Sequence, residues 1–429
     1  MAVSTSSSRR PRVVFLSREP VLHQQGGSTT YALGLLDLLR QHARVTLVST
    51  VAYSRSPRLY FRLQMQPPEG VRLRFPGYLR FGNFYICPFR LKAWARAASR
   101  WEQGRGGRQV LGPLLGLVFG DRLFTNAWDL TEPTSAERRI AVREITAARA
   151  SSVIANYCFW GPFLAEGRLG ARRTAILMHD LLSARIQKFV DAGLPLDCPH
   201  LSLDREMRWL SGAHTVLAAQ DREAAEIRPR VTARVLVAPI LLRPRALPPE
   251  RVIAGRCLFV GSNIQPNQTG LVFLLEQVWP RVRAVVPDAL LAVAGSVCQT
   301  LEELVPEASR QHDGVTGLGM VASLEDEYAQ AAVCLVPLLV GSGIKIKLLE
   351  ALGFGKAIVS TPVGIQGLET WADETILVAD TAEAFAEAIC CLLTNPTERV
   401  RREAAALRLA EQHFGPGCTL DPAFKAAVL

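Results

Sequence analysis

The residues best suited to chemistry lie in one turn, positions 341–351, which read Gly-Ser-Gly-Ile-Lys-Ile-Lys-Leu-Leu-Glu-Ala. Glycines let the backbone approach a ligand closely, and the free N–H groups at a helix start attract an anion. Lys345 and Lys347 add compact positive charge, in a chain with 43 arginines but only six lysines. Because each charge-assisted hydrogen bond contributes about 1.5–3 kcal/mol, the turn predicts a diphosphate site.

Glu350 lies one helical turn beyond Lys347, where its carboxylate can accept both hydroxyls of a ribose. The turn is not a Walker A loop, because no Gly-Lys-Ser/Thr follows the glycines. The alternative interpretation is an amphipathic helix whose lysines are solvated.

His179 ends an apolar strand and precedes Asp180. At the rim of a cleft this histidine can contact a ligand, although a structural turn histidine is the alternative. Asp180 is equally suited to capping the next helix and to chemistry. Glu206 and Glu223 sit in helical patterns typical of solvated faces, so no site role is predicted for them.

The elements that position these residues alternate between strand and helix along the chain. This alternation indicates two α/β domains with parallel sheets. Three prolines between positions 244 and 249 cannot continue a strand or helix and mark a linker. We expect a Rossmann-like acceptor domain at 1–240, a linker at 241–254, a nucleotide-sugar-binding Rossmann-like domain at 255–412, and a tail at 413–429 that packs back toward the first domain. Predicted strands cover 12–17, 44–49, 71–75, 152–156, 175–178, 214–219, 235–238, 257–260, 290–294, 333–337, 357–360 and 376–379.

The composition argues against several classes of protein. No run approaches the roughly 18 apolar residues of a membrane-spanning helix, and the apolar stretch Val13–Leu16 is too short for a signal peptide. A cytoplasmic protein is therefore expected. The nine cysteines include no C-x-x-C pair, which argues against a zinc site. No G-x-G-x-x-G follows the first strand of either half, which argues against a NAD-type dehydrogenase.

Residues 55–108 carry twelve basic residues against two acidic ones, an excess that equals the net charge of +10. Within this segment residues 88–101 form an amphipathic pattern, with Trp94 and Trp101 opposite Lys92, Arg96 and Arg100. Such a helix can lie on an anionic membrane surface, as a peripheral contact on the inner face of the membrane, or it can pack its tryptophans on the domain core. The sequence contains no recognisable nucleic-acid-binding module, so nucleic acid is not an expected partner.

Several short motifs recur in a fixed order along the second half: Phe259–Ser262, Trp279-Pro280, Val315–Gly317, Tyr328–Ala331, Val336-Pro337, the 341–350 turn and Gly355–Pro362. In combination they resemble the C-terminal domain of family 4 glycosyltransferases, which have the GT-B architecture of two Rossmann-like doubly wound domains facing across a cleft. The resemblance covers about residues 256–380. The N-terminal half resembles the family more loosely, through Gly26-Gly27 and Met178–Asp180.

The resemblance implies transfer of a sugar from a nucleotide-diphosphate donor, UDP-linked by preference, with retention of anomeric configuration and without a metal or cofactor. Glu350 would then hold the ribose, Lys345 and Lys347 the diphosphate, and His179 the transferred sugar. The remaining donor contacts would come from Gly26, Gly27, Gly261, Ser262, Gly317, Leu318, Val321, Ser342 and Gly343. The acceptor would be a glycan, a lipid-linked sugar or a small molecule.

Two positions depart from the family pattern. Ser342 stands where many members have the first carboxylate of a Glu-x7-Glu pair, and the loop after the first C-domain strand lacks the usual Arg and Lys. A nucleotide-sugar 2-epimerase of the same architecture and a catalytically degenerate nucleotide-sugar-binding scaffold therefore stay open as alternatives.

Overall fold

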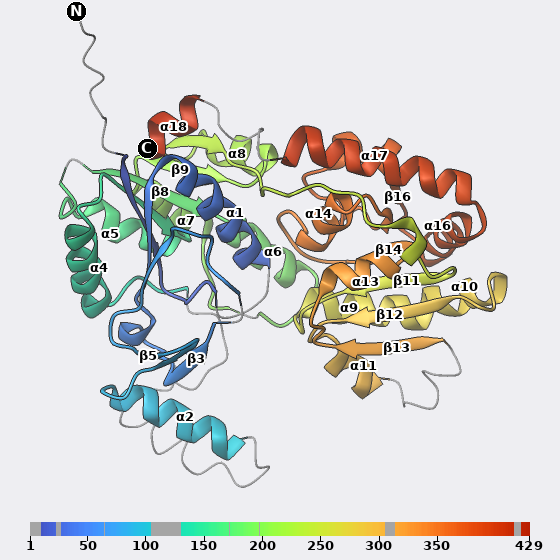
Figure 1. Cartoon of the computed structure of the whole chain (residues 1–429), viewed down its shortest axis with the longest axis horizontal. Helices are drawn as coiled ribbons and strands as arrows, with labels where there is room; N and C mark the ends of the chain where they lie inside the picture. The colour runs from blue at the N-terminus through green and yellow to red at the C-terminus, as the bar shows by residue number, and fades with distance from the viewer. Residues whose placement is uncertain are drawn as a thin grey trace, which may run out of the picture.

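Two parallel β-sheets, one in each half of the chain, organise the molecule, and helices cover both of them (Figure 1). In this computed structural model the described residues are 10–22, 27–63, 65–103, 130–170, 172–196, 198–304, 314–415 and 422–429. The strand interiors are runs of Val, Ile, Leu and Ala, the pattern of parallel strands buried on both faces.

The N-terminal sheet has seven strands in the order β10-β9-β8-β7-β1-β2-β4, all parallel. Its strands are β1 (Arg12–Ser17), β2 (Arg44–Ser49), β4 (Arg72–Arg74), β7 (Ser152–Asn156), β8 (Arg173–Met178), β9 (Thr215–Ala218) and β10 (Arg234–Val237). The helices of this domain are α1 (Gly27–His42), α4 (Ser135–Ala148), α5 (Gly161–Ala165), α6 (Leu182–Asp191), α7 (Leu203–Leu210) and α8 (Asp221–Ile227).

The C-terminal sheet has six parallel strands in the order β13-β12-β11-β14-β15-β16. They are β11 (Arg256–Val260), β12 (Leu290–Ala294), β13 (Val315–Gly319), β14 (Val333–Val336), β15 (Ala357–Ser360) and β16 (Ile376–Val378). The helices are α9 (Gln265–Phe273), α10 (Trp279–Val285), α11 (Cys298–Leu304), α13 (Leu324–Gln330), α14 (Ile346–Gly353), α15 (Ala372–Thr375), α16 (Ala382–Thr394) and α17 (Pro396–Phe414).

The chain crosses twice between the two domains. After β10 it runs without a strand to β11, and on the way it bonds to helices of the C-terminal domain, with Leu242 N donating to Phe414 O at 2.7 Å and Arg245 N to Gly353 O at 2.8 Å. After α17 the last helix, α18 (Pro422–Val428), packs against β7 and β8 of the N-terminal domain. Figure 1 shows this helix in red beside the N-terminal sheet.

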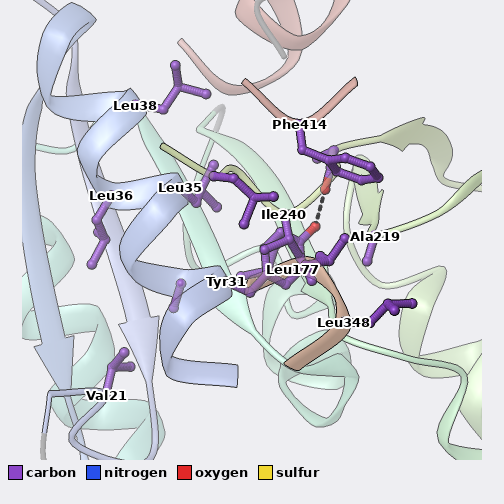
Figure 2. Packing of buried hydrophobic residues seen from close by; sticks show 14 of the residues in the cluster. Val21, Tyr31, Leu35, Leu36, Leu38, Leu177, Ala219, Ile240, Leu348 and Phe414 are labelled. Carbon is purple, nitrogen blue, oxygen red and sulfur yellow. Dashed lines mark hydrogen bonds between the residues drawn. The ribbon is translucent and has the colours of Figure 1, made fainter. Parts of the chain in front are cut away.

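One hydrophobic cluster joins the two domains. Tyr31 on α1, Ile240 in the crossing segment, Leu348 on α14 and Phe414 at the end of α17 all belong to it, and each is at most 3% exposed (Figure 2). The Tyr31 hydroxyl donates a hydrogen bond to the backbone oxygen of Ala238, so this buried polar group is satisfied. The cluster fixes α1 against the crossing segment and α14.

A small antiparallel sheet extends from the N-terminal domain, in the order β3-β6-β5. Its strands are β3 (Tyr60–Arg62), β5 (Leu79–Phe81) and β6 (Phe84–Ile86), and α2 (Leu91–Gln103) follows directly. Figure 1 shows α2 and this sheet together at one end of the domain. No helix among the described residues is both long enough and apolar enough to cross a membrane.

Every predicted strand is present in one of the two large sheets, within two residues of its expected ends, and the expected fold class is confirmed. Four strands were not expected: β13, β3, β5 and β6. The sequence 315–319 forms the edge strand β13 although it contains two glycines, and the small antiparallel sheet has strands of only three residues. The helix expected from residue 88 begins at Leu91.

Candidate functional site

The strand order reverses between β11 and β14, where β12 and β13 lie on one side and β15 and β16 on the other. In a doubly wound sheet the loops leaving the carboxyl ends of such strands diverge and leave a crevice for a ligand. The loop after β11 begins at Gly261, and the loop after β14 contains the 341–345 turn. The predicted diphosphate turn therefore lies at the switch point of the C-terminal sheet.

The turn itself requires its glycines. Gly341 and Gly343 have φ angles of +142° and +67°, which side-chain-bearing residues rarely adopt. A methyl group on Gly343 would also lie 2.9 Å from Cβ of Asp180, in the facing domain. This backbone shape brings the turn into direct contact with the N-terminal domain.

Both lysines of the turn are withdrawn from solvent, so the solvated-helix interpretation is wrong. Lys345 is 9% exposed, and its Nζ donates to Ser342 O at 3.0 Å, Gly343 O at 2.5 Å and Gln366 Oε1 at 3.2 Å. Lys347 is half-buried and donates to Asn267 Oδ1 at 2.6 Å. Lys347 thus spans the switch point from α14 to α9.

Burial lowers the pKa of both ammonium groups to about 7. Lys188 adds to the effect at Lys345 by charge repulsion, and at Lys347 the nearby Glu350 carboxylate opposes it. The Nζ of Lys347 also lies 4.4 Å from the centre of the Phe259 ring, a cation–π contact. Because burial disfavours the charged form of both lysines, an anionic ligand that pairs with them would be bound favourably here.

Glu350 is the third charged group on this helix. Its Oε2 accepts a hydrogen bond from the Tyr328 hydroxyl at 3.1 Å. Burial raises the pKa of this carboxyl to about 6, although the Tyr328 bond and Lys347 oppose the shift. Near neutral pH the group is therefore mostly a carboxylate with lone pairs to spare, as a ribose-binding residue requires.

The loop after β11 packs tightly against the loop after β12. Gly261 N donates to Ala294 O at 2.9 Å, and Val297 N donates to Gly261 O at 3.1 Å. Gly295 has φ +99°, and a methyl group there would lie 2.2 Å from Gly261 O. Ser262 is exposed beside this junction, and its backbone oxygen accepts from Asn267 Nδ2 at 2.8 Å. Asn267 thereby connects the predicted residues Gly261, Ser262 and Lys347.

The N-terminal domain meets the turn at three points. A methyl group on Gly27 would lie 2.6 Å from Cγ1 of Ile346, so α1 begins in contact with α14. Ser342 Oγ donates to Asp180 Oδ2 at 2.9 Å, and Lys188 Nζ donates to Gly341 O at 3.3 Å. The position where the family pattern has a carboxylate thus holds a serine that bonds to a carboxylate of the other domain.

His179 lies at the carboxyl end of β8 with a fixed ring orientation. Its Nε2 is 2.7 Å from Asn156 Oδ1, and its ring stacks on Tyr157 with centroids 4.2 Å apart. Tyr157 has φ +76°, a strained conformation for a side-chain-bearing residue that costs about 1–3 kcal/mol. Burial lowers the pKa of His179 to about 3, so the ring is neutral at physiological pH.

Glu206 and Glu223 are not on solvated faces, and that expectation is wrong. They are 0% and 6% exposed, and they accept hydrogen bonds from the backbone at the start of α6. Glu206 accepts from Leu182 N at 3.0 Å and Ser183 N at 2.7 Å, and Glu223 accepts from Leu181 N at 3.2 Å. Burial raises the pKa of each carboxyl to about 7. These two residues hold the chain that follows His179 and Asp180.

The structure brings most of the predicted site residues together around α14, but not all of them. Gly317 and Leu318 lie on the edge strand β13 and Val321 just beyond it, two strands away from β11. Gly26 lies outside the described residues. Sequence reasoning did not single out Asn267, Lys188 or Gly295, and among the described residues no cluster of three or more His, Cys, Asp or Glu side chains could hold a metal ion.

The Asp180–Ser342 bond predicts a measurable coupling between the domains. Asp180→Ala and Ser342→Ala should each lower the free energy of unfolding, and the double variant should lose less than the sum, by about 0.5–1.5 kcal/mol, because the same bond is lost in all three. Urea unfolding measures all three variants. The exposed pair Arg222–Glu369 bridges the same domains at 3.2 Å and serves as a control with little expected coupling. Strictly additive losses at Asp180 and Ser342 would contradict the bond.

Comparison with known sequences finds similarity over only part of the chain. Residues 254–395 match the protein family described as Glycosyl transferases group 1. A protein of Klebsiella pneumoniae, described as an uncharacterized 44.6 kDa protein in cps region, is 33% identical over 138 residues. That alignment spans 31% of this chain and 35% of the relative's length. Residues 254–395 are thus similar in sequence to group 1 glycosyltransferases, and the alignment spans about a third of the length of the curated relative.

Comparison with solved structures covers almost the whole chain. Sucrose-phosphate synthase from Thermosynechococcus elongatus is similar with a TM-score of 0.63 at 16% identity, over 97% of this chain and 98% of that one. Alr3699/HepE from Anabaena, crystallised with UDP, is similar with a TM-score of 0.61 at 12% identity, over 97% and 99%. A glycosyltransferase from Rickettsia africae has a TM-score of 0.59 at 10% identity, over 97% and 98%. These similarities confirm the GT-B architecture.

Proposed function

We propose that this protein is a retaining, metal-independent glycosyltransferase of family 4, which transfers a sugar from a nucleotide-diphosphate donor to a glycan, lipid-linked or small-molecule acceptor. The observation that carries the proposal is the pair of lysines at the switch point, Lys345 buried and Lys347 half-buried against Asn267, with Glu350 on the same helix as Lys347. The group 1 glycosyltransferase domain over residues 254–395 supports it. HepE was crystallised with UDP and with UDP-glucose, which supports a UDP-linked donor.

The lysines do the electrostatic part of the reaction. When the bond from the sugar to the diphosphate breaks, negative charge develops on the leaving phosphate oxygens. Lys345 and Lys347, with the backbone N–H groups at the start of α14, are placed to meet that charge, and preorganised donors of this kind lower the barrier. Their positive charge would stabilise the leaving diphosphate, as a divalent cation does in metal-dependent transferases.

The remaining groups position the reactants. Glu350 would hold the ribose, and the neutral ring of His179 would contact the transferred sugar from the N-terminal domain. An oxygen of the leaving phosphate would take the proton of the acceptor hydroxyl on the face from which the diphosphate departs, and attack from that face gives retention. No carboxylate nucleophile of the kind found in retaining glycosidases is needed.

One pair of measurements tests the proposal. Thermal-shift screening against UDP, GDP, ADP, TDP and CMP identifies the nucleotide, because a ligand at about 100 times its Kd stabilises by about 2.7 kcal/mol. The matching nucleotide-sugar is then incubated with the protein, and the products are separated. We expect a free nucleoside diphosphate and a sugar of unchanged ring configuration. A 2-epimerised sugar would select the epimerase, and binding without any turnover, with or without added acceptors, would select the scaffold.

A further inference from the structure

The surface of β3, β5, β6 and α2 differs from the rest of the described molecule in its aromatic exposure. Six large aromatic side chains of the described residues are more than a third exposed, and all six lie between positions 60 and 101. Leu79 and Leu91 are exposed among them. The exposed aromatic residues are Tyr60, Phe81, Phe84, Phe89, Trp94 and Trp101. Exposed apolar groups concentrated in this way mark an interaction surface.

The orientation of α2 rules out core packing as the role of its large side chains. Ala93 and Ala95 are buried at 0% and 8%, whereas Leu91, Trp94 and Trp101 are 78%, 52% and 62% exposed. The helix therefore rests on small residues and turns its large apolar residues outward. Of the two alternatives for this helix, the one in which the tryptophans pack on the domain core is wrong. Phe89, directly before the helix, is 81% exposed and extends the same surface.

The charge around these residues has one sign. Residues 60–62 and 79–101, which form β3, β5, β6 and the described start of α2, contain six basic residues and no acidic one. Arg62, Arg80 and Lys92 are exposed, and the guanidinium groups of Arg62 and Arg80 lie over the rings of Phe84 and Tyr85. Aromatic, leucine and basic side chains are thus interleaved, the combination found where proteins insert shallowly into an anionic lipid surface.

We propose that this surface, residues 60–101 of β3, β5, β6 and α2, docks the protein onto an anionic membrane. The aromatic and leucine side chains would enter the headgroup region while the exposed basic side chains, such as Arg62, Arg80 and Lys92, face lipid phosphates. A second copy of the chain fits less well, because a two-fold contact would set this positive surface against itself. The proposal does not depend on the reaction that the protein catalyses.

Flotation with vesicles tests the docking. The full chain should float with vesicles of phosphatidylcholine and phosphatidylglycerol, far less with phosphatidylcholine alone, and less as salt rises. Phe89→Ser with Leu91→Ser should weaken vesicle binding at least tenfold, and so should Arg80→Glu with Lys92→Glu. Two control variants should bind like the wild type: Val285→Ser, which removes an exposed apolar residue of α10, and Arg139→Glu, which reverses an exposed charge of α4.

Each result decides for or against the proposal. All four variants should keep the wild-type far-UV circular dichroism spectrum and melting temperature, which shows that lost binding is not lost folding. The docking is overturned by wild-type protein that ignores anionic vesicles, or by surface variants that float as well as the controls. It is equally overturned if the surface variants lose a concentration-dependent dimer, or tight binding of a single-stranded oligonucleotide, while vesicle binding is absent.

Discussion

Replacing Lys347 with Met is expected to weaken the binding of nucleoside diphosphates at least tenfold without destabilising the ligand-free protein. The ammonium group is buried, and its pKa is lowered to about 7, so the charge itself is a cost to the folded state. Met keeps the length and the apolar stem over Phe259 while removing that cost. The loss of one charge-assisted contact, about 1.5–3 kcal/mol, corresponds to a tenfold to more than hundredfold weaker affinity.

Thermal denaturation with and without the diphosphate measures both parts of this prediction. The ligand-free melting temperature of Lys347→Met should equal or exceed that of the wild type, and the ligand-induced increase should fall to about half or less. Lys425→Met, at an exposed lysine of α18, is the matched control and should keep the full increase. A Lys347→Met protein that is stabilised by diphosphate as strongly as the wild type would remove this residue from the site.

The affinity for a nucleoside diphosphate is expected to fall steeply as pH rises above 7. In the free protein Lys345 and Lys347 lose their protons near pH 7, whereas a bound diphosphate raises both pKa values and keeps them charged. Binding therefore takes up protons, and affinity should fall about tenfold per pH unit for each lysine that must be recharged. The stability of the ligand-free protein should change in the opposite sense. Because the folded pKa values lie below the usual 10.5, stability rises as pH increases from 7 toward 10.5.

Calorimetric titration between pH 7 and 9 measures the fall, since the ligand's own phosphate titrates lower, near about 6. Repeating the titration in two buffers with different ionisation enthalpies counts the protons taken up. We expect one to two protons at pH 8 for the wild type and one fewer for Lys347→Met. An affinity independent of pH over this range would contradict the contact between the lysines and the diphosphate.

The elements of the fold were predictable because the signals were local. Runs such as Val-Val-Phe-Leu in β1 and Ala-Ile-Val in β15 are apolar throughout. The strand β13 was not predicted because two of its five residues are glycine, which weakens the side-chain pattern of a strand. It lies at the edge of the sheet and pairs with β12 on one side only.

The contacts of the site were less predictable because they join distant parts of the chain. The segment 341–351 could be recognised from its glycines and its two lysines. Its bond from Ser342 to Asp180 links positions 162 residues apart in two domains, and no local pattern carries that information. For the same reason, the prediction that Glu206 lies on a solvated helix face was wrong. Its spacing is that of a solvated helix face, but the N–H groups that justify its burial belong to residues 182 and 183 on another helix.

The most direct test of the central claim is photolabelling with an azido derivative of the nucleoside diphosphate that the protein binds, followed by mapping of the labelled peptide. We expect the diphosphate at the switch point between β11 and β14. The resemblance to family 4 glycosyltransferases further implies that the base contacts the backbone of residues 317–321, at the end of the edge strand β13. Label on residues 315–321, competed by unlabelled nucleotide and lost in Lys347→Met, is the predicted result. Competed label confined to the N-terminal domain, with none on residues 255–380, would contradict it.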